Sequence, residues 1–421
     1  MIDLTLPPET IEVLDRLQRF IDDHVTPAEK GLTEEDFHNG RVESALPELR
    51  EAAREAGVYA PQIPTEFGGL ELGITALALI SERCGPHPLA SLAINAMAPD
   101  EANMHLLLHY GSDRQRKQWL EPLVGGEIRS CFGMTEPDAG SDPRRISSRA
   151  ERLPRGKWRI NARKVFTTGA RGAAFCIVMA VSDPEAPPGK GISMFIVPTD
   201  TPGFRIVRDL KTMGFPSLGG HPEISLEDVE VDDSAILGDL GAGFEMAQAR
   251  LEAGRLGHAM RWIGIGQKCL DMTAQRALER ETFGAPLASR QAVQWWLADG
   301  ATMLYASRLM VLNACWRIEQ GLPSGPEVSM TKTFVSEVLG EVVDRALQIY
   351  GAWGYTNETP IEQWYRDARG ARIYDGPSEV HRMFVARRIL KRVAEDGTAS
   401  GLCGDLTMAP QQASHAIRQG S

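Results

Sequence analysis

The sequence has little that would support a disulfide framework, a membrane span or a dinucleotide-binding sheet. Its six cysteines include no C-x-x-C pair and follow no regular spacing, which favours reduced thiols. No apolar run reaches the ~18 residues that a membrane-spanning helix needs. A complete G-x-G-x-x-G motif is also missing, because Gly241 and Gly243 supply only its first half, so a Rossmann site is not expected.

Positive charge is scarce as well. The 45 Lys and Arg are outnumbered by 56 Asp and Glu, which gives a net charge of -11. This balance argues against nucleic acid or an anionic membrane as the principal partner. The first residues have neither a basic signal-peptide region nor the Arg-rich character of a transit peptide. We therefore expect a soluble, cytoplasmic protein that binds no nucleic acid and has no membrane span.

The 421 residues are enough for a large core divided among two or three domains. Apolar positions three or four apart predict helices over residues 1–128. Short β-rich runs separated by Gly, Pro and Asp predict an antiparallel sandwich or barrel over 129–240. Helical spacing returns over 241–394, where an apolar stripe from Phe334 to Leu347 suits a bundle that also packs against another subunit. We expect the Gly-, Gln- and Ser-rich residues 395–421 to form a mobile tail.

Two histidines on the first group of helices have the spacing of a metal pair. His105 and His109 lie four residues apart, but the three residues between them are all leucine. A catalytic metal helix of this kind carries an acidic residue between its histidines. We therefore predict two packed helical histidines and no metal.

Residues 131–142 combine a strand-like segment with a turn of unusual composition. The turn contains Glu-Pro, Asp-Ala-Gly and Ser-Asp. Proline fixes one φ angle and glycine permits a positive one, so backbone N–H groups can face a ligand there. The hydroxyls of Thr135 and Ser141 add donors and acceptors. The composition favours a ligand-binding turn.

This turn resembles the flavin-contacting signature of the acyl-CoA dehydrogenase family, in which a Thr-Glu-Pro turn precedes Gly-Ser-Asp. Residues 164–169, Lys-Val-Phe-Thr-Thr-Gly, are similar to the family's strand behind the flavin, and 280–284 resemble its R-x-[TQ]-F-G run. The order of helices, sheet and helices matches the family along the whole chain. The resemblance implies an α+β fold with an N-terminal helical domain, a middle antiparallel β-sandwich or barrel, and a C-terminal four-helix bundle.

The resemblance also implies one FAD between the middle domain and the C-terminal bundle. Arg280 would meet the pyrophosphate, because a planar guanidinium pairs with two phosphate oxygens. Phe166 would lie against the isoalloxazine, and the Thr168 hydroxyl would reach its N5 edge. The bulky Trp353 stands where relatives carry small residues. The residues implied at the cofactor are Phe132, Met134, Thr135, Ser141, Phe166, Thr167, Thr168, Arg280, Phe283, Gln291, Gln348 and Gly351; those implied at the substrate are Ser141, Gly254, Arg255 and Gly376.

Residues 372–379, Arg-Ile-Tyr-Asp-Gly-Pro-Ser-Glu, resemble the segment that carries the family's catalytic base. Most members have glutamate there, whereas Asp-Gly-Pro is similar to the branch of family members ten and eleven. Asp375 is therefore the expected base, taking the α-proton while flavin N5 takes the β-hydride. Asp375 as a helix N-cap and Glu252 as the base are the alternatives, and Arg382 is a candidate to orient Asp375.

Three functions remain open from the sequence. The first is FAD-dependent dehydrogenation of an acyl-CoA to a trans-2-enoyl-CoA in fatty-acid β-oxidation, by a homo-oligomer (dimer or tetramer) that passes electrons to an electron-transferring flavoprotein. The second is a flavin oxidase of a small carbon acid, because nitroalkane oxidases of this fold also use an aspartate base. The third is a non-catalytic CoA-binding or helical assembly protein.

Overall fold

The fold is that of a computed structural model in which residues 5–214 and 216–399 are described. The chain divides into two compact units. Unit 1 takes in the described parts of Met1–Gln18, Gly73–Pro86 and Arg255–Ser421, and unit 2 comprises Arg19–Leu72 and His87–Gly254. The domain boundaries expected near residues 128 and 240 stay a prediction.

The N-terminal helices follow the spacing of apolar residues. Ser112 and Gln115 form the capping box typical of a helix start, with Gln115 N–H donating to Ser112 Oγ and Ser112 N–H donating to Gln115 Oε1. The helices are α1 (Pro8–Phe20), α2 (Thr26–Glu29), α3 (Arg41–Glu55), α4 (Ile74–Cys84), α5 (Ala90–Ala93), α6 (Asp100–Tyr110), α7 (Asp113–Gln115) and α8 (Glu121–Gly125), with π-helical turns at Ile21–Val25 and Arg116–Leu120.

Unit 2 contains one eight-stranded sheet with the order β6-β7-β3-β2-β4-β5-β8, and β1 pairs with β4 in parallel. Most other pairs are antiparallel, as expected from short strands and tight turns. The strands are β1 (Ser130–Gly133), β2 (Arg149–Leu153), β3 (Lys157–Lys164), β4 (Phe175–Val181), β5 (Ile192–Pro198), β6 (Phe204–Asp209), β7 (Pro222–Asp232) and β8 (Ile236–Leu237).

Burial in the sheet explains the sequence pattern of its strands. Alternate residues of β3 are buried, whereas nearly every residue of β4 and β5 is buried. Trp158 anchors this core through Phe195, with ring centroids 5.4 Å apart, and its indole N–H donates to Asp233 Oδ1 at 2.7 Å. The tryptophan's polar atom is therefore satisfied while its rings fill the core.

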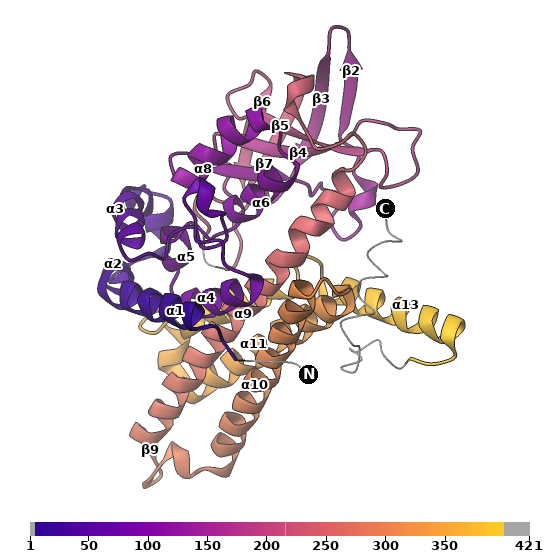
Figure 1. Ribbon diagram of the computed structural model, residues 1–421. Helices are drawn as coiled ribbons and strands as arrows, with labels where there is room; N and C mark the ends of the chain where they lie inside the picture. The colour runs from indigo at the N-terminus through magenta and orange to yellow at the C-terminus, as the bar shows by residue number, and fades with distance from the viewer. Residues whose placement is uncertain (1–4, 215, 400–421) are drawn as a thin grey trace. The chain divides into compact units, whose positions relative to one another are not determined.

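Unit 1 is built on long helices (Figure 1). These are the part of α9 (Gly243–Glu279) from Arg255 onward, α10 (Gln291–Glu319), α11 (Gly325–Tyr350), α12 (Ile361–Ala371) and α13 (Ser378–Asp396), with a small hairpin of β9 (Glu281–Thr282) and β10 (Ala285–Pro286). The α11 stripe from Val335 to Val343 is buried in the core of the unit, but Phe334 is 38% exposed. The expected order of helices, sheet and helices is confirmed.

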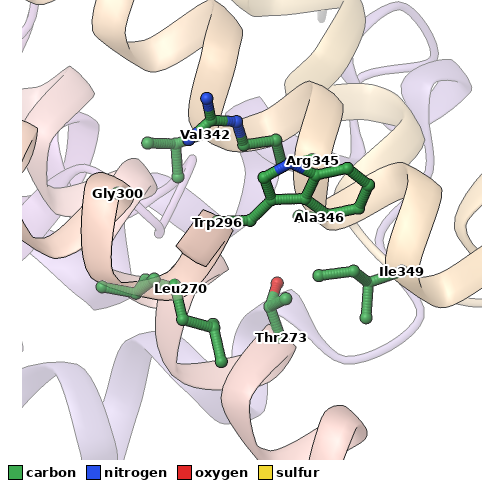
Figure 2. Close-up of a pocket in the computed structure, with 9 residues that line it drawn as sticks. Leu270, Thr273, Trp296, Gly300, Val342, Arg345, Ala346 and Ile349 are labelled. Atoms are coloured by element: carbon green, nitrogen blue, oxygen red, sulfur yellow. The ribbon is translucent and has the colours of Figure 1, made fainter. Parts of the chain in front are cut away.

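A cavity of about 10 Å³ lies between α9, α10 and α11 (Figure 2). Its lining includes Leu270, Thr273, Trp296 and Arg345. That volume holds about one water molecule, so the cavity is too small for a flavin or an acyl group.

Three expectations from the sequence concern membrane spans, metal ions and cysteine thiols. Within 5–214 and 216–399, no helix is long and apolar enough to cross a membrane, and no cluster of three or more His, Cys, Asp or Glu is arranged for a metal ion. His105 and His109 lie with ring centroids 4.3 Å apart on α6, and burial lowers the pKa of His105 to about 4. The five described cysteines are buried free thiols; Cys403 and residues 400–421 of the expected tail lie outside the described residues.

Candidate functional site

The predicted ligand-binding turn in unit 2 is held by a buried ion pair. Lys164 Nζ donates to Glu136 Oε1 at 2.8 Å and to the Met134 carbonyl at 3.2 Å. The Lys164 and Glu136 side chains are 0% and 4% exposed. The same carboxylate accepts the backbone N–H and the hydroxyl of both Ser147 and Ser148, at 2.5–3.0 Å. Glu136 therefore fixes the turn from inside and does not face a ligand.

The protonation states of this pair follow from these contacts. Burial favours a raised pKa for Glu136, but Lys164 and the serine donors outweigh it and lower the pKa to about 2. Burial lowers the pKa of Lys164, and Glu136 opposes that shift. The sequence analysis selected neither residue as functional, although Glu136 is part of the Thr-Glu-Pro motif.

The segment after β3 presents an aromatic ring and two hydroxyls. Phe166 has a φ of 55° and is 56% exposed. Thr168 Oγ1 lies 2.9 Å from His221 Nδ1, and burial lowers the pKa of His221. Thr167 Oγ1 is buried and has no hydrogen-bond partner among the described residues. An exposed ring beside an unsatisfied buried hydroxyl fits the face and polar edge of a flavin.

The other predicted cofactor residues of unit 2 surround the same turn. Thr135 is half-buried and its carbonyl accepts the Val165 N–H at 2.9 Å, whereas Ser141 is exposed. Met134 is half-buried. The Phe132 ring is covered by Arg250, whose guanidinium carbon lies 4.1 Å from the ring centroid. Sequence reasoning missed Arg250, which lies at the start of α9 in unit 2.

A second cluster, in unit 1, surrounds Asp375. This residue is in the left-handed region at φ 54°, and its carbonyl accepts from Arg255 Nε at 2.9 Å and from His381 Nε2 at 3.2 Å. The next carbonyl, of Gly376, accepts from Lys332 Nζ at 2.7 Å. Strained backbone of this kind persists only where several surrounding contacts hold it. Here three side chains, from α9, α11 and α13, hold it by donating to its carbonyls.

The turn requires glycine at 376. Gly376 has a φ of 97°, and a Cβ there would lie 2.8 Å from His381 Nε2.

The basic side chains around the turn have lowered pKa values. Burial lowers the pKa of Lys332 to about 8, although Asp375 opposes the shift. Burial, followed by Arg255 and Lys332, lowers the pKa of His381 to about 4. His381 is therefore a neutral donor at physiological pH.

The Asp375 carboxylate contacts a histidine that sequence analysis did not select. Asp375 Oδ2 lies 3.0 Å from His258 Nε2, and the two side chains are 25% and 18% exposed. Asp375 as a helix N-cap is wrong, because Pro377 holds that position in α13 and no side chain caps it. Arg382 does not orient Asp375; both of its terminal nitrogens bind Glu337, each at 2.7 Å. Glu252 and Gly254 lie in the unit 2 part of α9.

The remaining predicted cofactor residues lie at one end of the unit 1 helices. Ala277, Val293 and Ile349 pack together there, which joins the ends of α9 and α11 to the start of α10. The side chain of Phe283, at the hairpin tip, is 100% exposed, and Trp353 is 56% exposed. The predicted residues Arg280, Gln291, Gln348 and Gly351 are exposed at this same end.

Comparison with known proteins identifies the same family along the chain. Models of the N-terminal, middle and C-terminal domains of acyl-CoA dehydrogenases match residues 7–127, 131–229 and 241–390. Probable acyl-CoA dehydrogenase FadE2 of Mycobacterium tuberculosis is 36% identical, over 93% of this chain and 98% of the relative.

A second relative and a solved structure agree with this result. Acyl-CoA dehydrogenase family member 11 of Gallus gallus is 37% identical over 89% of this chain, which spans 50% of that relative's length. The structure of butyryl-CoA dehydrogenase from Megasphaera elsdenii superimposes with a TM-score of 0.81 at 27% identity, covering 92% of this chain and 100% of that one.

We predict that Lys164→Met lowers the free energy of unfolding by about 3–5 kcal/mol, because it leaves a buried carboxylate without its cation. Urea denaturation measures this change. In the double variant Glu136→Gln/Lys164→Met the loss should be smaller, since the buried charge is gone and the amide oxygen still accepts from one of the two serines. The matched control is Lys190→Met, which removes an exposed ion pair with Glu245 and should cost about 0–1 kcal/mol. Equal losses in Lys164→Met and Lys190→Met would contradict the stabilising role of the Lys164–Glu136 pair.

Proposed function

The chain belongs to the acyl-CoA dehydrogenase family, and from this premise we propose that Asp375 is the base in dehydrogenation of an acyl-CoA thioester to a trans-2-enoyl-CoA. The chain is an oxidoreductase and a flavoprotein, and its cofactor is FAD. When bound, FAD supplies the electron sink that accepts the β-hydride. The observation that carries the proposal is the Asp375 turn, in which a part-exposed carboxylate is held by a backbone fixed at three points.

Separate groups of residues have the proposed roles of base, turn support and cofactor binding. Asp375 accepts the α-proton. This requires a carboxylate oxygen within about 2.6–3.2 Å of the substrate's α-carbon, or a water molecule between them. Arg255, Lys332 and His381 hold the backbone of the turn that carries this carboxylate. Thr135, Ser141, Phe166, Thr167 and Thr168 in unit 2 are the proposed holders of the flavin ring. Arg280, Phe283, Gln291, Gln348 and Gly351 in unit 1 are proposed for the rest of FAD.

The aspartate also indicates the substrate. Its side chain is one methylene shorter than glutamate, so on an unchanged backbone its carboxylate lies back by about 1.5 Å. An acyl group with extra bulk or an oxygen substituent near its α- or β-carbon fills that space. We propose such an acyl-CoA as the substrate, with Ser141, Gly254, Arg255 and Gly376 among its contacts, and fatty-acid β-oxidation as the setting.

We predict that Asp375→Asn lowers the rate of flavin reduction by acyl-CoA by about 10²- to 10⁴-fold, since an amide accepts no proton. The variant keeps its FAD, because an amide oxygen still accepts from His258. Anaerobic stopped-flow measurement over an acyl-CoA panel checks this. Asp375→Glu retains activity shifted toward unbranched acyl-CoAs. Glu252→Gln is the matched control and stays within a few-fold of wild type; the reverse ranking of Asp375→Asn and Glu252→Gln would move the base to α9.

The proposed electron acceptor is an electron-transferring flavoprotein. Phe166, exposed on unit 2, stands where many relatives carry tryptophan and is the proposed exit for electrons. We predict that holoenzyme reduced by substrate returns its electrons to such a flavoprotein far faster than to air-saturated buffer. Flavin absorbance after rapid mixing measures both rates. Reoxidation by oxygen at an equal rate would favour the carbon-acid oxidase instead.

The proposed assembly is a homo-oligomer, a dimer or a dimer of dimers, located in the cytoplasm. Phe283, Trp295, Trp353 and Tyr355 are 100%, 58%, 56% and 81% exposed at the shared end of the unit 1 helices. Exposed aromatic residues gathered in this way mark an interface.

We predict that Phe283→Asp combined with Tyr355→Asp lowers the mass measured by light scattering at micromolar concentration, because it puts charge into an apolar contact. Val207→Asp, at a residue 53% exposed on β6, is the control and leaves the mass unchanged. A wild-type protein that is monomeric with FAD bound would overturn the assembly.

A further inference from the structure

His258 is fixed between the carboxylate of Asp375 and the guanidinium of Arg261. Its Nε2 lies 3.0 Å from Asp375 Oδ2, and its Nδ1 lies 2.6 Å from Arg261 Nη2. The ring lies against Trp262, with centroids 6.0 Å apart, and against Tyr374, at 5.3 Å. The Trp262 indole N–H donates to the Tyr374 hydroxyl at 3.1 Å. Both ring nitrogens of His258 therefore have a partner, and two aromatic rings lie beside the imidazole.

The contact with Arg261 determines which nitrogen of His258 carries the proton. A guanidinium has only N–H donors, so His258 Nδ1 must accept. The proton of the neutral ring is then on Nε2, which donates to Asp375 Oδ2. Burial and then Arg261 lower the pKa of His258, and the hydrogen bond to Asp375 only partly opposes them, which keeps the ring neutral.

We propose that His258, held in this tautomer by Arg261, is the positioning residue that fixes the Asp375 carboxylate through Oδ2 while Oδ1 takes the α-proton. This inference rests on the proposed function of Asp375. In the step, the substrate's α C–H bond breaks, an O–H bond forms at Oδ1, and the electron pair stays with the thioester. Oδ2 remains an acceptor for Nε2–H before and after proton transfer, so the pair need not rearrange.

The positions on α9 make this arrangement possible. His258, Arg261 and Trp262 follow at spacings of three and four residues, so they share one face of the helix. The backbone contacts of Arg255, Lys332 and His381 fix the turn that carries Asp375. The contact of His258 Nε2 with Oδ2 restricts the torsion of the carboxylate itself.

The test measures α-proton removal without hydride transfer. The wild-type holoenzyme is incubated in D₂O with 3,3-dimethylbutanoyl-CoA, which has α-hydrogens but no β-hydrogen, and deuterium uptake is followed by mass spectrometry. A glutamine amide nitrogen reaches the place of His258 Nε2, whereas an asparagine amide reaches only the place of Nδ1. We therefore expect His258→Asn to slow exchange about 100-fold and His258→Gln to restore most of the rate.

A pH profile of exchange separates positioning from packing. The charged and titratable groups near the pair are Arg255, Arg261, Lys332, Tyr374, Glu379 and His381. All of them are unchanged in the variants. Losing a donor to the carboxylate raises the pKa of the base, so the acidic limb of the His258→Asn profile should move to higher pH by about one unit. The His258→Gln profile should stay near that of wild type.

A readout independent of turnover is the urea midpoint of a double-mutant cycle. Asp375→Asn should shift the midpoint less in the His258→Asn background than in wild type, because the Nε2–H donor that discriminates between carboxylate and amide is absent. Equal shifts in both backgrounds would overturn the contact.

The outcomes separate this inference from the proposed function. No exchange by wild type, or undiminished exchange by Asp375→Asn, overturns the proposed base. Exchange abolished by Asp375→Asn but equal in His258→Asn and His258→Gln keeps the base and overturns the positioning role of His258.

Discussion

The buried pair of Lys164 and Glu136 is the interaction on which the proposed flavin-binding turn of unit 2 depends. It joins the end of β3 to the turn that follows β1, two segments separated by nearly thirty residues. A buried carboxylate is costly unless every oxygen is satisfied, and here one lysine and two serines supply five hydrogen bonds. The charges of this pair point inward, and the Phe166 ring beside it is exposed.

The Asp375 turn of unit 1 follows the same logic with the roles reversed. There the backbone carbonyls of Asp375 and Gly376 take up the donors, so the carboxylate itself is not consumed as a structural anchor. Both residues have positive φ, and the Asp375 carboxylate contacts His258 of α9. In both units, therefore, buried charge fixes the backbone so that a neighbouring group is available for chemistry.

The sequence predicted those features that are local or repeated. Helical spacing predicted α9 to α11, and the strand runs predicted a mainly antiparallel sheet, because each depends on neighbours within a few residues. Motif resemblance placed Asp375 in its turn. His258 and Lys332 were missed because their partners lie far away in the sequence and nothing local distinguishes them from surface polar residues. Glu136 is part of the Thr-Glu-Pro motif, but its partner Lys164 lies 28 residues away. Arg382 was misjudged for the same reason: its partner, Glu337, lies on α11.

Asp375, the proposed base, and His258 are connected by geometry. A glutamate reaches its substrate through an extra torsion, and packing along a longer chain can restrict that torsion. Asp375 has only two side-chain torsions, and its backbone is already fixed, so one hydrogen bond to one oxygen suffices to determine where the other oxygen points. An aspartate in this position therefore extends less far than a glutamate, but its carboxylate orientation is more tightly fixed. That orientation depends on a hydrogen-bond donor whose own tautomer is fixed. Arg261 provides that condition by leaving His258 a single way to bind.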